Sequence, residues 1–342
     1  MRADRVIISR TDNIGDVVLT LPMVGILRRC RPDAEILFLG RGYTRPVIES
    51  CVHVDALLDW DEVADGSAAE QTEFLARARA DTIIHVLPQK DIAAAARRAR
   101  IPQRIGTSHR LFHLWNCNHR VHFTRRRSDL HEAQLDVKLL RPFGVREVPS
   151  LKEIGTLYGL TRVPPLRSGL ARLLAGDRVN LVLHPKTKGN AKEWPLENYG
   201  RLIERLPADR FRIFVTGTRE EAEAIGDRLS SDRRVTSLVG ELSGADLVAF
   251  ISRVDALVAA STGPLHLAAA LGKLAVGLYA PKRPRHPGRW GPVGPRAHAL
   301  VFDPECERCR EKGVDCDCIR RIEPAAVASL LEPLAASRRR SL

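Results

Sequence analysis

The sequence predicts an α/β protein built from two doubly wound, Rossmann-like parallel-sheet domains, and three observations lead to that class. The chain has 342 residues, more than the roughly 100–200 residues of an ordinary single domain. Short apolar runs rich in β-branched residues alternate with amphipathic stretches, the pattern of parallel strands joined by helices. The alternation weakens around residues 144–176, where prolines and separated glycines favour a domain boundary.

The first domain is predicted over residues 1–160, with strands and helices taking turns. Its strands are expected at residues 5–9, 35–40, 56–60 and 82–87. Its helices are expected at residues 16–29, 68–80 and 91–100. Pro22 lies inside the first helix, and we expect a kink near the helix start because a proline ring removes one backbone hydrogen bond.

The second domain is predicted over residues 161–322 and repeats the pattern. Its strands are expected at residues 179–183, 212–216, 235–239, 256–260 and 275–279. Its helices are expected at residues 196–206, 219–229, 245–253 and 264–271. Residues 323–342 are expected to form a helix and a basic tail, with packing on the first domain as one option. Because ligands of open parallel sheets bind beyond the carboxyl ends of the strands, we expect the site in a cleft between the domains.

Composition indicates a soluble protein that attracts anions. No apolar run resembles a secretion signal or approaches the roughly 20 residues that span a bilayer. Seven cysteines, an odd number, favour reduced thiols and a cytoplasmic location. The net charge of +13 predicts attraction to phosphates of a nucleotide, a nucleic acid or an anionic membrane surface, without choosing among them.

The first motif with chemical potential joins the first strand to the first helix. It is Arg10-Thr11-Asp12-Asn13-Ile14-Gly15-Asp16. The helix dipole favours an ionised carboxylate at Asp16, which could accept a proton from an acceptor hydroxyl. The alternative is that Asp12, Asn13 or Asp16 caps the helix, since these residue types are common caps.

The second motif follows the first strand of the second domain, from His184 to Pro195. Three lysines, a hydroxyl and a glycine ahead of a helix suit a diphosphate, which needs positive charge and close backbone approach. A solvated basic loop is the alternative, because lysine is mostly exposed in proteins. The glycine spacing is not that of a Walker loop.

The third motif, Ser261-Thr262-Gly263-Pro264-Leu265-His266, also joins a strand end to a helix start. A hydroxyl cap, Gly263 and Pro264 favour a tight helix start whose free amides could hold a phosphate. His266 could bond to the same ligand. An isolated histidine, however, more often serves a local hydrogen-bond network.

Together these motifs resemble glycosyltransferase family 9, the lipopolysaccharide heptosyltransferase family. The segments DNIGDVVLTLP (12–22), HP followed by KEWPLEN (184–198) and STGPLHLAAALG (261–272) carry the resemblance, which extends over about residues 5–335. It implies a GT-B fold and an inverting transfer without a catalytic metal or cofactor. It also implies an ADP-sugar donor, heptose first, held mainly by the C-terminal domain, and an anionic lipopolysaccharide-core or related glycan acceptor. Peripheral contact with the cytoplasmic face of the inner membrane is one option.

Carried over by position, the resemblance implies a role for each motif residue. Asp16 is expected to be the general base, and Lys192 is expected to neutralise the donor phosphate. The other residues expected to bind the donor are Lys186, Thr187, Lys188, Thr216, Gly217, Glu220, Leu242, Ser261, Thr262, Gly263 and His266. Those expected near the acceptor are Arg10, Asn13, His131 and Glu132. The family usually has an acidic residue where this chain has Ser261, so another NDP-sugar stays open as the donor.

Two further features have alternative interpretations. Residues 128–134 resemble the family around His131 and Glu132, but Asp129 capping a helix would explain the same pattern. Four cysteines near the C-terminus, Cys306, Cys309, Cys316 and Cys318, are enough for a structural zinc ion. Because their spacing is unusual, we favour a reduced loop without metal.

Two other functions remain as alternatives to sugar transfer. A nucleotide-sugar epimerase or isomerase could use the same fold, because fold does not determine reaction. A basic nucleic-acid-binding protein is disfavoured, because aromatic residues make up only 5% of the chain and provide no evident stacking platform. We therefore expect no nucleic-acid partner.

Overall fold

The computed structural model describes residues 4–125, 128–187, 189, 191–229, 232–311 and 316–339. The chain divides into two compact units, Met1–Arg162 and Val163–Leu342. Each unit contains a six-stranded sheet, and every strand pair in both sheets is parallel. The predicted α/β class with two doubly wound sheets is confirmed.

The sheet of the first unit has the strand order β3-β2-β1-β4-β5-β6. Its strands are β1 (Arg5–Ser9), β2 (Glu35–Gly40), β3 (Ala56–Asp59), β4 (Thr82–His85), β5 (Gln103–Thr107) and β6 (His119–Val121). The order reverses between β1 and β4, where Val6 pairs with Thr82. The carboxyl ends of these two strands are therefore the expected position for a functional site.

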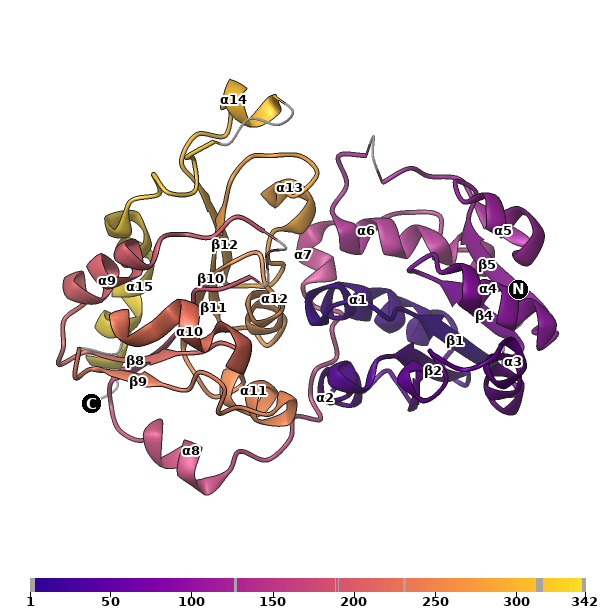
Figure 1. The fold of residues 1–342 in the computed structure, drawn as a ribbon, viewed down its shortest axis with the longest axis horizontal. Coiled ribbons are helices and arrows are strands. Elements are labelled where there is room, and N and C mark those ends of the chain that lie inside the picture. Colours follow the sequence, from indigo (N-terminus) through magenta and orange to yellow (C-terminus); the bar gives the residue numbers. More distant parts are fainter. Residues whose placement is uncertain are drawn as a thin grey trace. The chain divides into compact units, whose positions relative to one another are not determined.

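Helices flank this sheet, and α1 and α6 lie side by side (Figure 1). The helices are α1 (Ile14–Cys30), α2 (Arg45–Glu49), α3 (Ala68–Arg77), α4 (Lys90–Arg98), α5 (Leu111–Asn116), α6 (Glu132–Val137) and α7 (Leu151–Ile154), with 3₁₀ turns η1 (Gly42–Thr44), η2 (Trp60–Glu62) and η3 (Lys138–Phe143). α1 runs unbroken through the buried Pro22. α3 begins with a capping box in which Ser67 and Glu70 each bind the other's backbone amide.

The second sheet has the order β12-β11-β10-β7-β8-β9, which is the topology of the first sheet repeated. Its strands are β7 (Val179–His184), β8 (Phe211–Val215), β9 (Val235–Ser237), β10 (Ala256–Ala260), β11 (Leu274–Tyr279) and β12 (Ala297–Val301). The order reverses between β7 and β10, where Leu183 pairs with Val258. All residues of β7, β10 and β11 are buried, as expected for strands covered on both faces.

The helices of the second unit agree with most of the predicted ranges. They are α8 (Ser168–Leu173), α9 (Leu196–Arg205), α10 (Ala222–Ile225), α11 (Gly244–Ile251), α12 (Gly263–Ala270), α13 (Pro287–Trp290), α14 (Glu307–Arg310) and α15 (Pro324–Arg339), with 3₁₀ turns η4 (Arg219–Glu221) and η5 (Gly226–Arg228). The single helix predicted over residues 219–229 is wrong. It is divided into η4, α10 and η5, and Gly226 has a positive φ of 54° where α10 ends.

The closing helix α15 packs against α9 and β7 of the same unit (Figure 1). Val327 and Leu331 on this helix join the hydrophobic core that contains Trp194 and Tyr199. Among the described residues, no helix combines the length and the apolar character needed to cross a bilayer.

Candidate functional site

The second unit contains a pocket of about 360 Å³ where β7, β10 and β11 reach their carboxyl ends. Its lining residues are Ala191, Lys192, Ser261, Leu278, Tyr279, Ala280, Lys282, Arg283, Pro284, Arg285 and Ile319. Ser261 directly follows β10, and Ala280 directly follows β11. The pocket therefore lies at the edge of the sheet where ligands of this topology bind.

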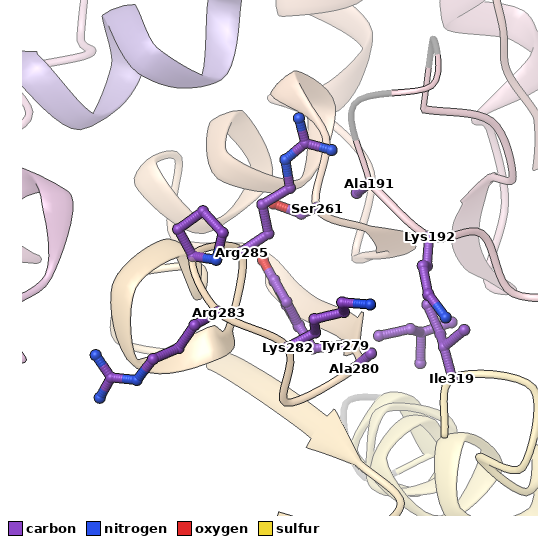
Figure 2. Close-up of a pocket in the computed structure, with 11 residues that line it drawn as sticks. Ala191, Lys192, Ser261, Tyr279, Ala280, Lys282, Arg283, Arg285 and Ile319 are labelled. Atoms are coloured by element: carbon purple, nitrogen blue, oxygen red, sulfur yellow. The ribbon is translucent and has the colours of Figure 1, made fainter. Parts of the chain in front are cut away.

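The pocket is strongly cationic. Lys192, Lys282, Arg283 and Arg285 line it, and none of the described lining residues is acidic. Figure 2 shows Lys192 and Lys282 extending toward the same space from opposite sides, whereas the side chain of Arg283 extends away from it. Two ammonium groups beside the start of a helix, whose first amides have no partner within the helix, are suited to an anion with several oxygens, such as a diphosphate.

The loop after β7 is braced by its own side chains. Lys186 Nζ donates a hydrogen bond of 2.9 Å to Glu193 Oε2, and the backbone amide of Thr187 donates one of 3.0 Å to Glu193 Oε1. Thr187 Oγ1 also donates to the carbonyl of Ala191 at 2.9 Å. Glu193 therefore holds the predicted donor residues Lys186 and Thr187 within the loop, while Lys188 lies outside the described residues.

Lys192 is held from a distant part of the chain. Its Nζ donates a 2.7 Å hydrogen bond to the carbonyl oxygen of Cys316. Trp194, two residues later, donates from its indole nitrogen to the carbonyl of Ile322 at 3.0 Å. The segment from Cys316 to Ile322 therefore fixes the position at which Lys192 enters the pocket.

α12 begins within the third motif, as predicted, but without the predicted hydroxyl capping bond. Thr262 is the N-cap residue, but its side chain makes no capping hydrogen bond. Its Oγ1 is buried and has no hydrogen-bond partner among the described residues. Pro264 occupies the first turn, and His266 is buried one turn into the helix. This helix start lies directly after the pocket residue Ser261.

Four other residues expected to bind the donor, Thr216, Gly217, Glu220 and Leu242, follow the neighbouring strands β8 and β9. Thr216 is buried, with Oγ1 2.9 Å from His184 Nδ1. The amide of Gly240 donates a 3.0 Å hydrogen bond to the carbonyl of Gly217 and so joins the loops after β8 and β9. Glu220 is exposed and Leu242 is half-buried near these loops. They lie outside the lining of the pocket.

In the first unit, a buried arginine stands at the point where the strand order reverses. Arg10 follows β1 directly, and its side chain is only 3% exposed. The four carboxylates around its guanidinium come from two segments of the chain. They are Asp12 (Oδ1 at 2.7 Å), Asp16 (Oδ1 at 2.5 Å), Asp136 (Oδ2 at 3.5 Å) and Glu132 (Oε1 at 3.7 Å).

A second arginine completes this group, which we call the Arg10 network. Arg125 donates to Glu132 Oε1 at 2.8 Å, to Asp136 Oδ1 at 2.9 Å and to the carbonyl of Val86 at 3.2 Å. Val86 directly follows β4, so the network binds the ends of β1 and β4 to α1 and α6. Among the described residues, two arginines face four carboxylates, so full ionisation of these six groups would leave an excess of negative charge.

Asp16 is one of two carboxylates of the Arg10 network with exposed surface. Its side chain is 16% exposed and that of Asp12 is 22% exposed, whereas Glu132 and Asp136 are fully enclosed. Arg10 holds Asp16 Oδ1, while Asp16 Oδ2 has a long contact of 3.5 Å with the exposed Asn13. Asn13 occupies the N-cap position of α1, as the capping interpretation allowed, but its side chain makes no capping hydrogen bond.

Comparison with known proteins shows the family to which this chain belongs. The sequence model of glycosyltransferase family 9 (heptosyltransferase) matches residues 75–319, well over half of the chain. The chain belongs to glycosyltransferase family 9. Lipopolysaccharide heptosyltransferase 3 of Escherichia coli strain K12 is 22% identical to it over 283 residues, which cover 78% of this chain and 79% of the relative.

Solved structures show that the family 9 fold extends over nearly the whole chain. A family 9 glycosyltransferase from Veillonella parvula superimposes with a TM-score of 0.75 at 19% identity, covering 98% of this chain and 97% of its own. Escherichia coli heptosyltransferase WaaC with ADP superimposes with a TM-score of 0.73 at 19% identity, covering 96% of this chain and 99% of its own. The predicted GT-B fold is confirmed, and the chain is a sugar-transferring enzyme.

Two predicted acceptor residues have other partners in this family 9 structure. His131, rather than Asp129, is the N-cap residue of α6, and its Nδ1 accepts from the amide of Ala133 at 3.2 Å. Glu132 is buried in the Arg10 network. Their side chains are 1% and 2% exposed, and both contribute to fixing α6, so their expected contact with an acceptor stays a prediction. Arg10, also predicted at the acceptor, is committed to carboxylates in the same way.

Sequence reasoning missed the basic residues after β11. Lys282, Arg283 and Arg285 lie in a proline-rich loop directly beyond a predicted strand. The rule that ligands bind beyond strand ends, applied to this strand as to the other two, would have found them.

The buried carboxylates of the Arg10 network should make the free energy of unfolding of the first unit depend on pH. Burial is the main cause that raises the pKa of Asp136 from 3.8 to about 7, with the charge of Glu132 acting in the same direction. Between these two values the folded state binds a proton that the unfolded chain has released. The contribution of Asp136 to stability therefore falls as the pH rises through this window.

Asp136→Asn is expected to reduce that loss. Asparagine cannot ionise but keeps an acceptor for Thr20 or Arg125. From about pH 5 to about pH 8, the variant should gain stability relative to the wild type, on the order of a few kcal/mol. Hydrogen exchange of the β1 amides at several pH values measures this difference. If the stability from hydrogen exchange changed equally with pH in both proteins, Asp136 would not be the group that causes the pH dependence.

Proposed function

We propose that this family 9 enzyme transfers a sugar from an ADP-sugar to a lipopolysaccharide-core or related anionic glycan acceptor, with inversion and without a catalytic metal. The cationic pocket of the second unit carries the proposal, because it combines converging lysines, a helix start and the absence of acidic groups among its described lining residues. The fold neighbour WaaC has been solved with ADP, which supports adenine as the base. The net charge of +13 favours action at an anionic cytoplasmic membrane face.

In the proposed reaction, Asp16 is the general base. Its Oδ2 accepts the proton of an acceptor hydroxyl while that oxygen attacks the anomeric carbon of the donor sugar. The bond between this carbon and the diphosphate breaks, and ADP leaves with the bonding electrons. The reaction requires one acceptor hydroxyl to lie within reach of both Asp16 Oδ2 and the anomeric carbon of the donor sugar. General bases of this kind contribute about 10²- to 10⁴-fold to rate.

Arg10 is proposed as a positioning residue. It binds Asp16 Oδ1 at 2.5 Å and is itself held by Asp12 and the carboxylates of α6. This arrangement fixes the rotamer of Asp16 and directs its second oxygen away from the network. Arg125 supports the same geometry because it donates hydrogen bonds to both Glu132 and Asp136.

The departing diphosphate is proposed to be stabilised from three directions. Lys192 and Lys282 supply charge from opposite sides of the pocket, and the amides at the start of α12 supply hydrogen bonds. Thr262 Oγ1, buried without a partner among the described residues, would be satisfied by a phosphate oxygen. Such preorganised groups act where negative charge develops, and this is commonly the largest contribution to catalysis.

The donor sugar is proposed to be heptose, with another sugar as the alternative. Ser261 lines the pocket where the family usually has an acid, so a neutral hydroxyl replaces a charged acceptor for sugar hydroxyls. A hydroxyl makes weaker hydrogen bonds than a carboxylate. Comparison of ADP-heptose with ADP-hexoses as donors will establish which sugar this pocket accepts.

Lys282→Ala and Lys192→Ala are each expected to raise the Kd for ADP by about 10- to 100-fold. A charge-assisted hydrogen bond contributes roughly 1.5–3 kcal/mol, and alanine removes it. Calorimetric titration with ADP measures the change. Lys152→Ala is the matched control, since Lys152 is an exposed lysine of α7 in the first unit.

The same titration tests the proposed function as a whole. ADP should bind more tightly than UDP, GDP or CDP and should raise the melting temperature, because a ligand that prefers the folded state stabilises it. If the lysine variants bound ADP as tightly as the wild type does, this pocket would not be the donor site. Lack of binding by all four nucleotides would reject the proposed donor class.

A further inference from the structure

Four cysteine side chains converge in the connection between β12 and α15. The Sγ atoms of Cys306, Cys309, Cys316 and Cys318 all lie within 4.8 Å of one another. Cys316 Sγ is 3.4 Å from Cys306 Sγ and 3.3 Å from Cys318 Sγ. All four cysteines are free of disulfides in the structure.

This convergence is a built feature of the interior. Cys309, Cys316 and Cys318 are between 2% and 5% exposed, and they join the hydrophobic core of the second unit. The connection over residues 302–323 contains one short described helix, the four-residue α14, so regular secondary structure contributes little to its order. Binding of a metal ion couples to folding and can supply the order that a long irregular connection lacks.

The spacing of the sulfurs fits one tetrahedral ion. A zinc–sulfur bond of about 2.3 Å places the sulfurs of a tetrahedron about 3.8 Å apart. The measured separations of 3.3 and 3.4 Å and the limit of 4.8 Å lie on either side of that value. A disulfide would join two sulfurs at about 2.05 Å and would not explain why four meet at one point.

We propose that these four thiolates bind one zinc ion as a structural site. Four protein ligands complete the coordination shell, so the ion has no open position for substrate and takes no part in sugar transfer. This differs from the loop without metal that the cysteine spacing favours. The decisive observation is that all four sulfurs, and not two pairs, come together.

The site is connected to the cationic pocket through short segments of backbone. The carbonyl of Cys316 accepts the 2.7 Å hydrogen bond from Lys192, and Ile319 lines the pocket one residue after Cys318. Asn198 Nδ2 adds a 2.9 Å hydrogen bond to the carbonyl of Arg320. An ion at the cysteines would therefore hold in place the backbone that positions Lys192.

Metal analysis of the purified full-length protein tests the site independently of the proposed function. One zinc ion per chain is expected in the wild type and in Cys30→Ser, a control that replaces a partly exposed cysteine outside the cluster. Cys306→Ser replaces the most exposed member of the cluster and should lose most of the metal. Absence of metal from wild-type protein made with zinc supplied, or equal metal in all three proteins, would overturn the proposal.

A second measurement does not depend on the folding of a variant. A mercurial reagent that caps thiols should release zinc from the wild-type protein, and a chelating dye should detect one ion for four capped cysteines. If the amount of zinc released did not increase with the number of capped thiols, the proposal would be overturned. Iron at one ion per chain, which also accepts tetrahedral thiolate ligands, would support the four-thiolate site but overturn zinc as its ion.

The connection to Lys192 rests on the proposed function and has its own readout. Gentle removal of the metal should raise the Kd for ADP about as much as Lys192→Ala does, roughly 10-fold or more. An unchanged Kd after metal loss would reject the connection and leave the site intact. Failure of the wild type to bind ADP would reject the proposed function, while the metal content would still decide the site.

Discussion

Asp16→Asn is expected to lower kcat by roughly 10²- to 10⁴-fold while the Kd for ADP stays unchanged. Asparagine keeps an oxygen for Arg10 but cannot accept the proton of the acceptor hydroxyl. The affinity for ADP should persist because the donor residues lie in the second unit. Steady-state kinetics of sugar transfer and calorimetric titration with ADP measure the two effects separately.

Asp12→Asn is the matched control for this prediction. Asp12 also binds Arg10 and is also partly exposed, at 22% against 16% for Asp16. Burial is the main cause that raises the pKa of Asp12 to about 6. We expect its replacement to change kcat by less than about tenfold, because it would lose an orienting contact and not the base. The reverse result, with Asp12→Asn inactive and Asp16→Asn active, would assign the base to Asp12.

Arg10→Met is expected to destabilise the first unit by about 3–5 kcal/mol, because removing one partner of a buried ion network leaves charges without compensation. Glu132 and Asp136 would keep Arg125, whereas Asp12 and Asp16 would lose the arginine that they share. Sugar transfer should also fall, since Asp16 would lose the group that holds its Oδ1. Hydrogen exchange of the β1 amides measures the stability of this unit without requiring the whole chain to unfold in one step.

The control for Arg10 is an exposed ion pair in the same unit. Arg77 pairs with Glu73 on α3, and their side chains are 73% and 63% exposed. Arg77→Met should change stability by less than about 1 kcal/mol, as is usual for solvent-exposed pairs. Equal effects of the two substitutions would show that the Arg10 network contributes no more than surface charges do.

The buried centres of both sheets were predictable from the sequence, whereas three strands at or next to a sheet edge were missed. β1, β2 and β10 have the predicted bounds because parallel strands covered on both faces are continuous apolar runs. β5, β6 and β12 were missed. They contain polar residues such as Arg104, Arg120 and His298, so no apolar run marks them; β6 and β12 are edge strands, and β5 lies next to an edge.

The candidate site divides in a similar way. Motifs at strand ends were found from local sequence, because a turn residue, a charge and a helix start follow one another along the chain. The Arg10 network was not found as a network, since Asp136 and Arg125 reach Arg10 only through the pairing of β1 with β4 and the packing of α6 on α1. The partner of Lys192, a backbone carbonyl near the C-terminus, leaves no signature in the identity of residue 316.

The most direct test of the account is the release of ADP from ADP-heptose by the purified enzyme, measured with and without lipopolysaccharide-core acceptors of stepwise truncated length. The account predicts that ADP release depends on one of these acceptors, that the acceptor gains the mass of one heptose, and that Asp16→Asn prevents both. Consumption of ADP-heptose at the same rate without any acceptor, or full activity of Asp16→Asn, would contradict it.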